Sequence, residues 1–220
     1  MKTDDLIERL ARDTARVQPL ANPGARTAAW VAWVVAYLGI VAFAMLRKGS
    51  PAGLVASPLY LLQQVAALVT GITAARAALL SVVPGRRTRW ALPASAGGVW
   101  IALLVWQAAA DVQAFGRLGL GQESDWPCVV SMIAGGLAIG APLIWMLRRG
   151  APLSPRASAL LAGVAALSVA NLEACLTRAH AFASTVLLWH GGTIAFAAAV
   201  LVASSGRWLK WPVLTSRLGA

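Results

Sequence analysis

The sequence predicts an all-α, polytopic membrane protein with six transmembrane helices and a short cytoplasmic amphipathic helix at the N-terminus. Of its 220 residues, 59% are hydrophobic and only 12% are charged, whereas a soluble domain usually carries about 25% charge. The charged residues gather between long apolar runs. A formal net charge of +11 does not indicate nucleic-acid binding, because the basic residues flank apolar runs instead of forming a continuous basic face.

The first element is the segment MKTDDLIERLARDTARV, which is predicted to form the amphipathic helix. Thr3 suits a helix cap, and Asp4 and Asp5 suit the first turn. Apolar positions then recur at helical spacing and comprise Leu6, Ile7, Leu10, Thr14 and Val17. The helix is mixed in charge, whereas a helix that binds anionic lipid is usually more basic. We expect it to dock into a groove on a cytoplasmic partner; the alternative is an overhang that lies on the membrane and sets topology.

The remaining elements are six apolar segments, each near the ~20 residues that cross a hydrocarbon core ~30 Å thick. Their expected bounds are 27–46, 59–83, 94–115, 128–147, 157–177 and 182–204. The first segment is expected to stay in the protein and not to be cleaved as a signal peptide. The chain therefore divides into a cytoplasmic binding segment, residues 1–26, and a transmembrane domain, residues 27–220.

Individual residues within the segments carry further expectations. Prolines such as Pro58 and Pro155 fall beside the connections and are expected to end helices. Trp30 falls near a predicted membrane interface, where aromatic side chains gather. Gly136 and Gly140 have the GxxxG spacing that lets helices approach closely, which predicts packing and no more specific role.

The distribution of Lys and Arg predicts the orientation. With the N-terminus inside, most of these residues fall on inner segments, and the outer segments hold only Arg47, Lys48, Arg117 and Arg178. Positively charged residues are enriched in cytoplasmic loops. We therefore expect both termini to be cytoplasmic.

The same topology gathers candidate sensing residues at the outer face. Cys128 opens the fourth segment and Cys175 lies near the outer end of the fifth, with Glu173, His180 and His190 close by. Ionisable residues near membrane depth cost free energy and so indicate function. Cysteine and histidine are ligands that suit copper(I) and zinc, which makes these five residues candidate metal ligands. The cysteines could also form a disulfide or pack as inert apolar groups, and His190 could be a buried histidine bonded to a backbone carbonyl.

Other function classes are less well supported. An enzyme is not expected, because no nucleophile–histidine pair, paired carboxylates or closely spaced cysteine pair stands out. The main rival is a metal-ion transporter or channel. The chain lacks repeated halves and the pair of broken helices that many transporters use, and its intramembrane charges lie toward one end.

The opening MKTDDLIERLARDTARV, followed by six spans, resembles the NrsF-like membrane anti-sigma factors of proteobacteria. Those proteins share a very similar N-terminal stretch, and their cysteines near the outer ends of the fourth and fifth spans match Cys128 and Cys175. The pair Trp189-His190 is also similar. One departure is Arg16-Val17, where the family often has Pro-Val.

The resemblance implies a bacterial inner-membrane protein that keeps an extracytoplasmic-function sigma factor from RNA polymerase and has no direct contact with nucleic acid. It implies a sigma-binding set on the N-terminal helix, which comprises Asp4, Asp5, Leu6, Ile7, Leu10, Ala11 and Asp13. Cys128 and Cys175 would take a heavy-metal or oxidative signal. Copper(I), zinc or cadmium would act as a signal ligand and not as a constitutive cofactor.

Overall fold

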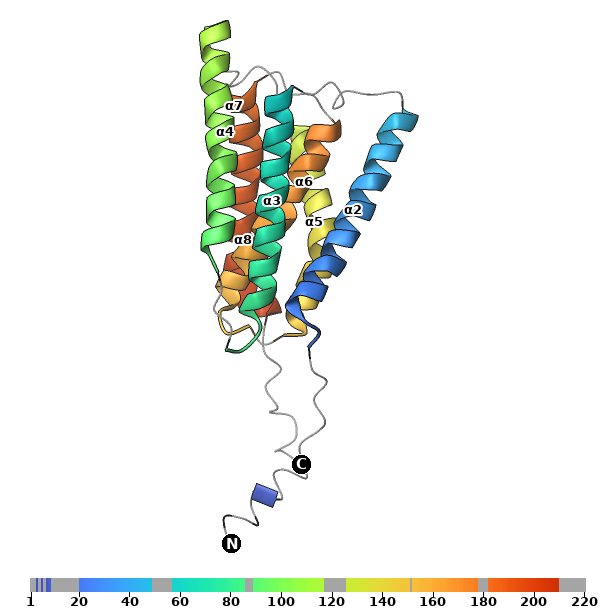
Figure 1. Ribbon diagram of the computed structural model, residues 1–220, viewed down its shortest axis with the longest axis vertical. Coiled ribbons are helices and arrows are strands. Elements are labelled where there is room, and N and C mark those ends of the chain that lie inside the picture. The colour runs from blue at the N-terminus through green and yellow to red at the C-terminus, as the bar shows by residue number, and fades with distance from the viewer. Residues whose placement is uncertain are drawn as a thin grey trace.

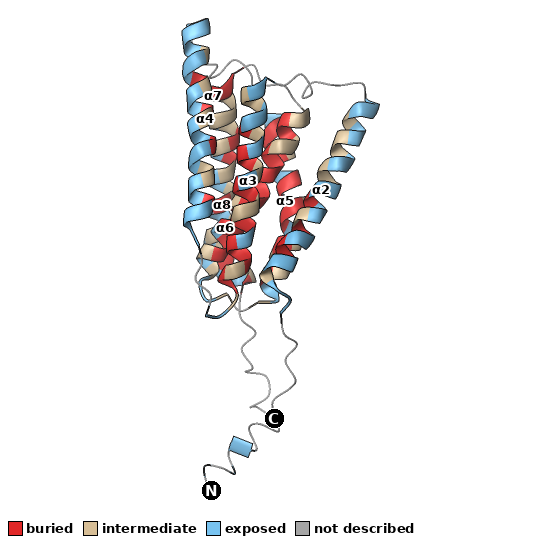
Figure 2. Cartoon of the chain, in the orientation of Figure 1, coloured by how far each residue is buried: buried red, intermediate tan, exposed pale blue. Residues whose placement is uncertain are grey.

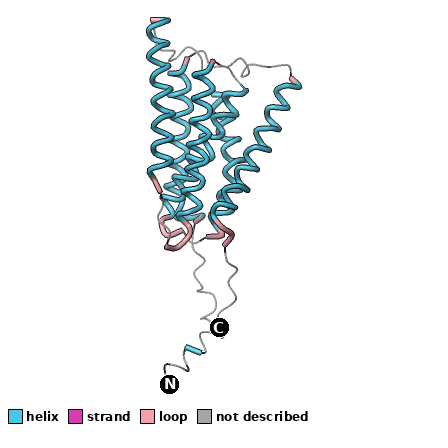
Figure 3. Tube along the Cα trace, in the orientation of Figure 1, coloured by secondary structure: helices cyan, strands magenta, loops and turns pink. Residues whose placement is uncertain are grey.

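The computed structural model describes residues 20–48, 57–85, 89–116, 126–150, 152–177 and 182–209, together with Thr3, Asp5, Ile7 and Glu8. Across these residues all regular structure is helical (Figure 3). Six helices are long and apolar enough to cross a membrane, which confirms the predicted fold class. The elements are α2 Pro23–Arg47, α3 Pro58–Ser81, α4 Ala91–Phe115, α5 Trp126–Arg148, α6 Pro155–Thr177, α7 Ala183–Thr185, the π-helix η1 Val186–His190, and α8 Gly191–Trp208.

Prolines begin several of these helices. Pro23, Pro58 and Pro155 are the first residues of α2, α3 and α6, because the first turn of a helix does not need the N–H that proline lacks. The side chains of Asn22 and Ser57 cap the first two by accepting hydrogen bonds from the N–H groups of Gly24 and Tyr60. Pro58 and Pro155 therefore lie at helix boundaries, as expected, but they begin helices instead of ending them, and these helices start slightly earlier than the apolar runs.

Helix α6 lies at the centre of the bundle. It contacts α2, α3, α5 and α8, and 72% of its most apolar stretch is buried, against 11% for α2. Figures 1 and 2 show α2 at one side, tilted, with its second half diverging from the other helices and largely exposed. Large apolar side chains such as Phe43, Trp106 and Phe196 face outward, as expected where the surroundings are lipid.

The two ends of the bundle differ in charge. At the end where α2 begins and α8 ends (Figure 1) lie Arg26, Arg76, Arg89, Arg148, Arg149, Arg156 and Arg207. We call this the basic end. At the opposite end, which holds Cys128 and Cys175 and is called the cysteine end, the basic residues in the described part of the chain are Arg47 and Lys48. This asymmetry follows the pattern on which the predicted orientation depends.

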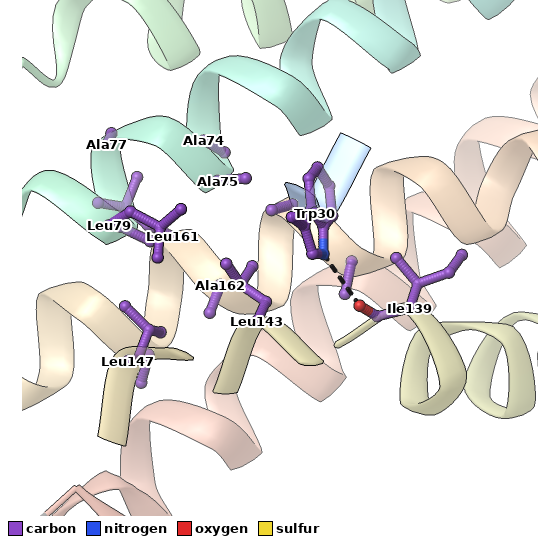
Figure 4. Close-up of a cluster of buried hydrophobic side chains, with 14 of the residues drawn as sticks. Trp30, Ala74, Ala75, Ala77, Leu79, Ile139, Leu143, Leu147, Leu161 and Ala162 are labelled. Carbon is purple, nitrogen blue, oxygen red and sulfur yellow. Dashed lines mark hydrogen bonds between the residues drawn. The ribbon is translucent and has the colours of Figure 1, made fainter. Parts of the chain in front are cut away.

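Two backbone carbonyl groups of α5, close to a proline, accept hydrogen bonds from tryptophans of α2. Pro142 lies inside that helix and has no N–H to donate to the carbonyl of Ala138, four residues earlier. The indole Nε1 of Trp33 donates to that carbonyl at 3.1 Å, and Nε1 of Trp30 donates to the next one, on Ile139, at 3.0 Å (Figure 4). Trp30 is fully buried in the main apolar cluster. The expectation that Trp30 belongs to an interfacial aromatic belt is therefore wrong, because its N–H finds a partner inside the bundle.

Small residues set the spacing of α6 from its neighbours. A Cβ atom added at Gly136 would lie 2.7 Å from Leu167, and one at Gly140 would lie 3.2 Å from Ala166. The GxxxG pair therefore packs against α6, as expected. Gly71 on α3 meets backbone as well as side chain, because an added Cβ would lie 2.8 Å from Val169 and 3.1 Å from the backbone oxygen of Ala165.

We expect Gly71→Ala to lower the free energy of unfolding by ~1–3 kcal/mol, the usual cost of overpacking a close contact. The matched control is Gly98→Ala on α4, where an added Cβ meets nothing within 4 Å and helix propensity favours alanine. Unfolding of the detergent-solubilised variants by a denaturing detergent measures the difference. Equal stability of the two variants would contradict the close α3–α6 contact.

Candidate functional site

Both cysteines lie at the cysteine end of the bundle, on adjacent helices. Cys128 is in the first turn of α5 and Cys175 is in the last turn of α6, and these two helices pack against each other. Their exposed fractions are 1% and 2%. Burial of this kind shields thiols from solvent, which lowers their reactivity. An ion or oxidant from solution therefore has little direct access to either thiol in this arrangement.

Cys175 belongs to a buried polar group that spans two helices. Oδ1 of Asn171, one turn earlier on α6, lies 3.9 Å from Sγ of Cys175 and 2.7 Å from Nδ1 of His190. With this amide oxygen as the acceptor, His190 carries a hydrogen on Nδ1, and its Nε2 has the lone pair that a metal ligand uses. Nδ1 of His190 thus contacts a side-chain amide, a different partner from the backbone carbonyl considered above. Tyr60 adds a third helix, since its hydroxyl donates to the carbonyl oxygen of Cys175 at 3.1 Å.

The backbone around His190 is irregular. Residues Val186–His190 form a π-helix between α7 and α8, and Gly191 and Gly192 follow. Short π-helical turns are rare and occur frequently at functional sites. Here the turn ends at His190, whose side chain is fully buried against α6.

Glu173 forms a separate junction on another face of α6. Its Oε2 accepts a hydrogen bond from the hydroxyl of Tyr37 on α2 at 2.8 Å, and its Oε1 accepts one from Ser131 on α5 at 3.2 Å. One carboxyl group thus joins three helices, two of which carry the cysteines. We call Glu173, Tyr37 and Ser131 the Glu173 junction.

Gly135 makes room for this junction. A Cβ atom there would lie 1.9 Å from Oε2 of Glu173 and 3.2 Å from the Tyr37 hydroxyl oxygen. A side chain at this position of α5 would therefore force the carboxyl group to move from its place beside Tyr37. The close approach gives Gly135 a role that a sequence pattern of small residues does not distinguish from ordinary packing.

Asp111, another acidic residue at the cysteine end, has a structural contact. Its Oδ2 accepts a hydrogen bond from the N–H of Ala183 at 2.9 Å. Ala183 is the first residue of α7, so this carboxyl group satisfies one of the unpaired N–H groups at a helix start.

The five candidate metal ligands separate into distinct groups. His190 and Cys175 meet through Asn171, and Glu173 lies in its own junction. Cys128 lies in the first turn of α5, and His180 is outside the described residues. Among the residues that the structure describes, no three His, Cys, Asp or Glu side chains lie close enough together to hold a metal ion. Metal binding by Cys128, Cys175, His180, His190 and Glu173 therefore stays a prediction.

The sequence reasoning missed Asn171, Tyr37, Tyr60 and Ser131. Asn171 could have been identified from the sequence, because it is an amide in an apolar span one turn before Cys175. No sequence feature identifies Tyr37 or Ser131, since their role depends on which helices become neighbours.

The predicted sigma-binding segment is described in part. Asp5 and Ile7 are helical and exposed, and Ile7 is 59% exposed. Asp4, Leu6, Leu10, Ala11 and Asp13 lie outside the described residues. The assignment of this set to sigma-factor binding stays a prediction.

Comparison with known proteins gives one match. No curated protein and no solved structure matches the chain. The family described as negative regulator of sigma F (NrsF) matches residues 10–211, which is nearly the whole sequence and confirms the resemblance. The description of this family indicates a regulatory role, the negative regulation of a sigma factor. The chain belongs to the NrsF family of negative regulators of sigma F.

Proposed function

We propose that this protein is an inner-membrane anti-sigma factor that binds an extracytoplasmic-function sigma factor through its N-terminal helix. A heavy metal or an oxidant at Cys128 and Cys175 releases the sigma factor. The basic end faces the cytoplasm, as the excess of arginine there favours, and both termini lie on that side. The cysteines then face the opposite side of the membrane, where an external signal arrives.

The Glu173 junction is the observation that carries this proposal. The helix that follows the N-terminal segment is α2, and Tyr37 ties α2 to Glu173 between the two cysteine helices. A displacement of α5 or α6 at the cysteine end therefore changes the contacts that hold α2 against these two helices. A two-site switch requires such a connection between its sites.

Signal binding must favour the releasing arrangement. Metal binding displaces the thiol protons and draws Cys128 and Cys175 toward one ion, with His190, His180 or Glu173 as further ligands and copper(I), zinc or cadmium as candidates. Disulfide formation would join the two Sγ atoms and transfer two electrons and two protons to an oxidant such as a peroxide. Because both thiols are buried in the described arrangement, either event stabilises an opened state of α5 and α6.

The test is capture of the cognate sigma factor by the detergent-solubilised protein, with and without copper(I), zinc, cadmium or hydrogen peroxide. We expect the wild type to retain ~90% or more of the sigma factor and to lose at least ~90% of it with one stimulus, which requires a shift of the switch by ~2.7 kcal/mol or more. Cys128→Ser/Cys175→Ser should retain it throughout. Release from the double variant by the same stimulus would contradict the sensing role, and no capture under any condition would contradict the anti-sigma role.

A further inference from the structure

A cavity at the basic end combines buried positive charge with lipid-facing apolar surface. It has a volume of about 710 Å³ and lies where α2 begins and α5 ends. Its walls comprise Leu20, Ala21, Ala25, Arg26, Ala29, Trp145, Met146 and Arg149. It lies at the opposite end of the bundle from both cysteines.

Arg26 gives this cavity its unusual feature. The residue is only 8% exposed. One guanidinium nitrogen, Nη2, donates to the carbonyl oxygen of Met146 near the end of α5, whereas Nη1 is buried with no hydrogen-bond partner among the described residues. Arginine stays charged in proteins, and a buried charge without sufficient partners costs free energy. The cavity therefore presents an unsatisfied cationic donor.

A second guanidinium group lies at the rim. The Arg149 guanidinium carbon stacks 3.6 Å from the centroid of the Trp145 ring. Stacking holds the planar group by its face and leaves its N–H edge available for an anion. Two guanidinium groups suit a phosphate, because their N–H groups match phosphate oxygens in pairs.

The apolar walls identify the kind of phosphate. Ala25, Ala29 and Trp145 are exposed to the surroundings of the bundle and lie in membrane-spanning helices. A free phosphate ion has no apolar part that could pack against this surface. A phospholipid, by contrast, places acyl chains against it while its phosphate stays at the membrane boundary. Basic pockets between transmembrane helices bind anionic head groups in this way.

We propose that this cavity binds the phosphate of an anionic glycerophospholipid, held by Arg26 and Arg149, with an acyl chain along Ala29 and Trp145. The bound lipid would join α2 to α5 at the base of the N-terminal segment. The proposal requires only that the basic end lies at a membrane surface. It does not depend on sigma-factor binding or on metal sensing.

The test is native mass spectrometry of the full-length protein in detergent, titrated with dioleoyl phosphatidylglycerol or dioleoyl phosphatidylcholine. We expect tighter binding of phosphatidylglycerol by the wild type, and at least a tenfold loss of this preference in Arg26→Gln/Arg149→Gln. The matched control is Arg76→Gln/Arg89→Gln, which removes the same charge from another cavity at the basic end, where Arg76 is exposed. This control should keep the preference.

The single variant Arg149→Gln distinguishes loss of the lipid site from a folding defect of the double variant, because it leaves the hydrogen bond from Arg26 to Met146 in place. It should still weaken the preference for phosphatidylglycerol. Equal phosphatidylglycerol binding by the wild type and Arg149→Gln would overturn the proposal. Displacement of the lipid by millimolar inorganic phosphate would overturn the choice of a lipid. Binding that appears only after deletion of residues 2–19 would also overturn it, because the protein's own N-terminal segment would then be the occupant.

Discussion

Replacing Ile7 and Leu10 with aspartate is expected to abolish repression of the sigma factor. Ile7 is exposed and helical, and the amphipathic helix predicted from the sequence would place Leu10 on the same face, at the spacing of one turn. Buried apolar anchors of this kind contribute ~2 kcal/mol or more each to an interface. Loss of both corresponds to a decrease in affinity of roughly a thousandfold. A sigma-dependent reporter should then reach the level seen when the anti-sigma gene is deleted.

The control for this experiment is Arg12→Asp, on the predicted polar face of the same helix. Arg12→Asp makes the segment two units more negative, as does the Ile7→Asp/Leu10→Asp pair, so the two variants differ in the face that they alter. We expect Arg12→Asp to preserve most repression. Repression that survives the apolar double variant would show that the sigma factor docks elsewhere, for example on the loops of the basic end. Immunoblots of membrane fractions verify equal protein levels.

The sequence was sufficient for the helices and for the placement of the cysteines. Long apolar runs separated by charge have few solutions other than membrane-spanning helices, so the number of spans followed directly. The alternation of helix direction then put Cys128 and Cys175 at the same end. The exact boundaries needed the structure, because Pro58 and Pro155 are the first residues of helices that start slightly before the apolar runs.

The contacts between helices were beyond the sequence. Trp30 near the start of an apolar run is typical of an interface residue, yet the carbonyl of Ile139 on α5 provides a buried partner for its indole. Similarly, Glu173 was recognisable as a costly charge near membrane depth, but its partners Tyr37 and Ser131 come from two other helices. Periodicity specifies which residues share a face and does not specify which helix that face meets.

Glu173→Leu is expected to raise sigma-dependent transcription in the absence of any signal. The substitution removes both hydrogen bonds of the Glu173 junction, each of which contributes ~1 kcal/mol. If the junction supports the arrangement that holds the sigma factor, the releasing state gains ~2 kcal/mol, or roughly thirtyfold in population ratio. A reporter strain without added metal or oxidant measures this increase. Glu173→Gln retains acceptor capacity for Tyr37 and should remain closer to the wild type.

Gly135→Ala tests the same junction without altering its hydrogen-bonding groups. The added methyl group would overlap Oε2 of Glu173 and force the carboxyl group away from Tyr37. We expect raised basal transcription here too, whereas Gly39→Ala on α2, where an added Cβ meets nothing within 4 Å, should behave as the wild type. Melting temperatures in detergent distinguish a shifted switch from general unfolding. Normal repression and normal release in a folded Glu173→Leu variant would remove the junction from the mechanism.

The position of the junction between the two sites predicts the outcome of combining these variants. Glu173→Leu in the Cys128→Ser/Cys175→Ser background should keep its raised basal transcription, because the break lies on the sigma-binding side of the cysteines. It should also lack any further response to metal or oxidant. If serine at both cysteines restores full repression instead, the thiols act after the junction. The connection through Tyr37 and α2 would then not be the route by which the signal reaches the N-terminal helix.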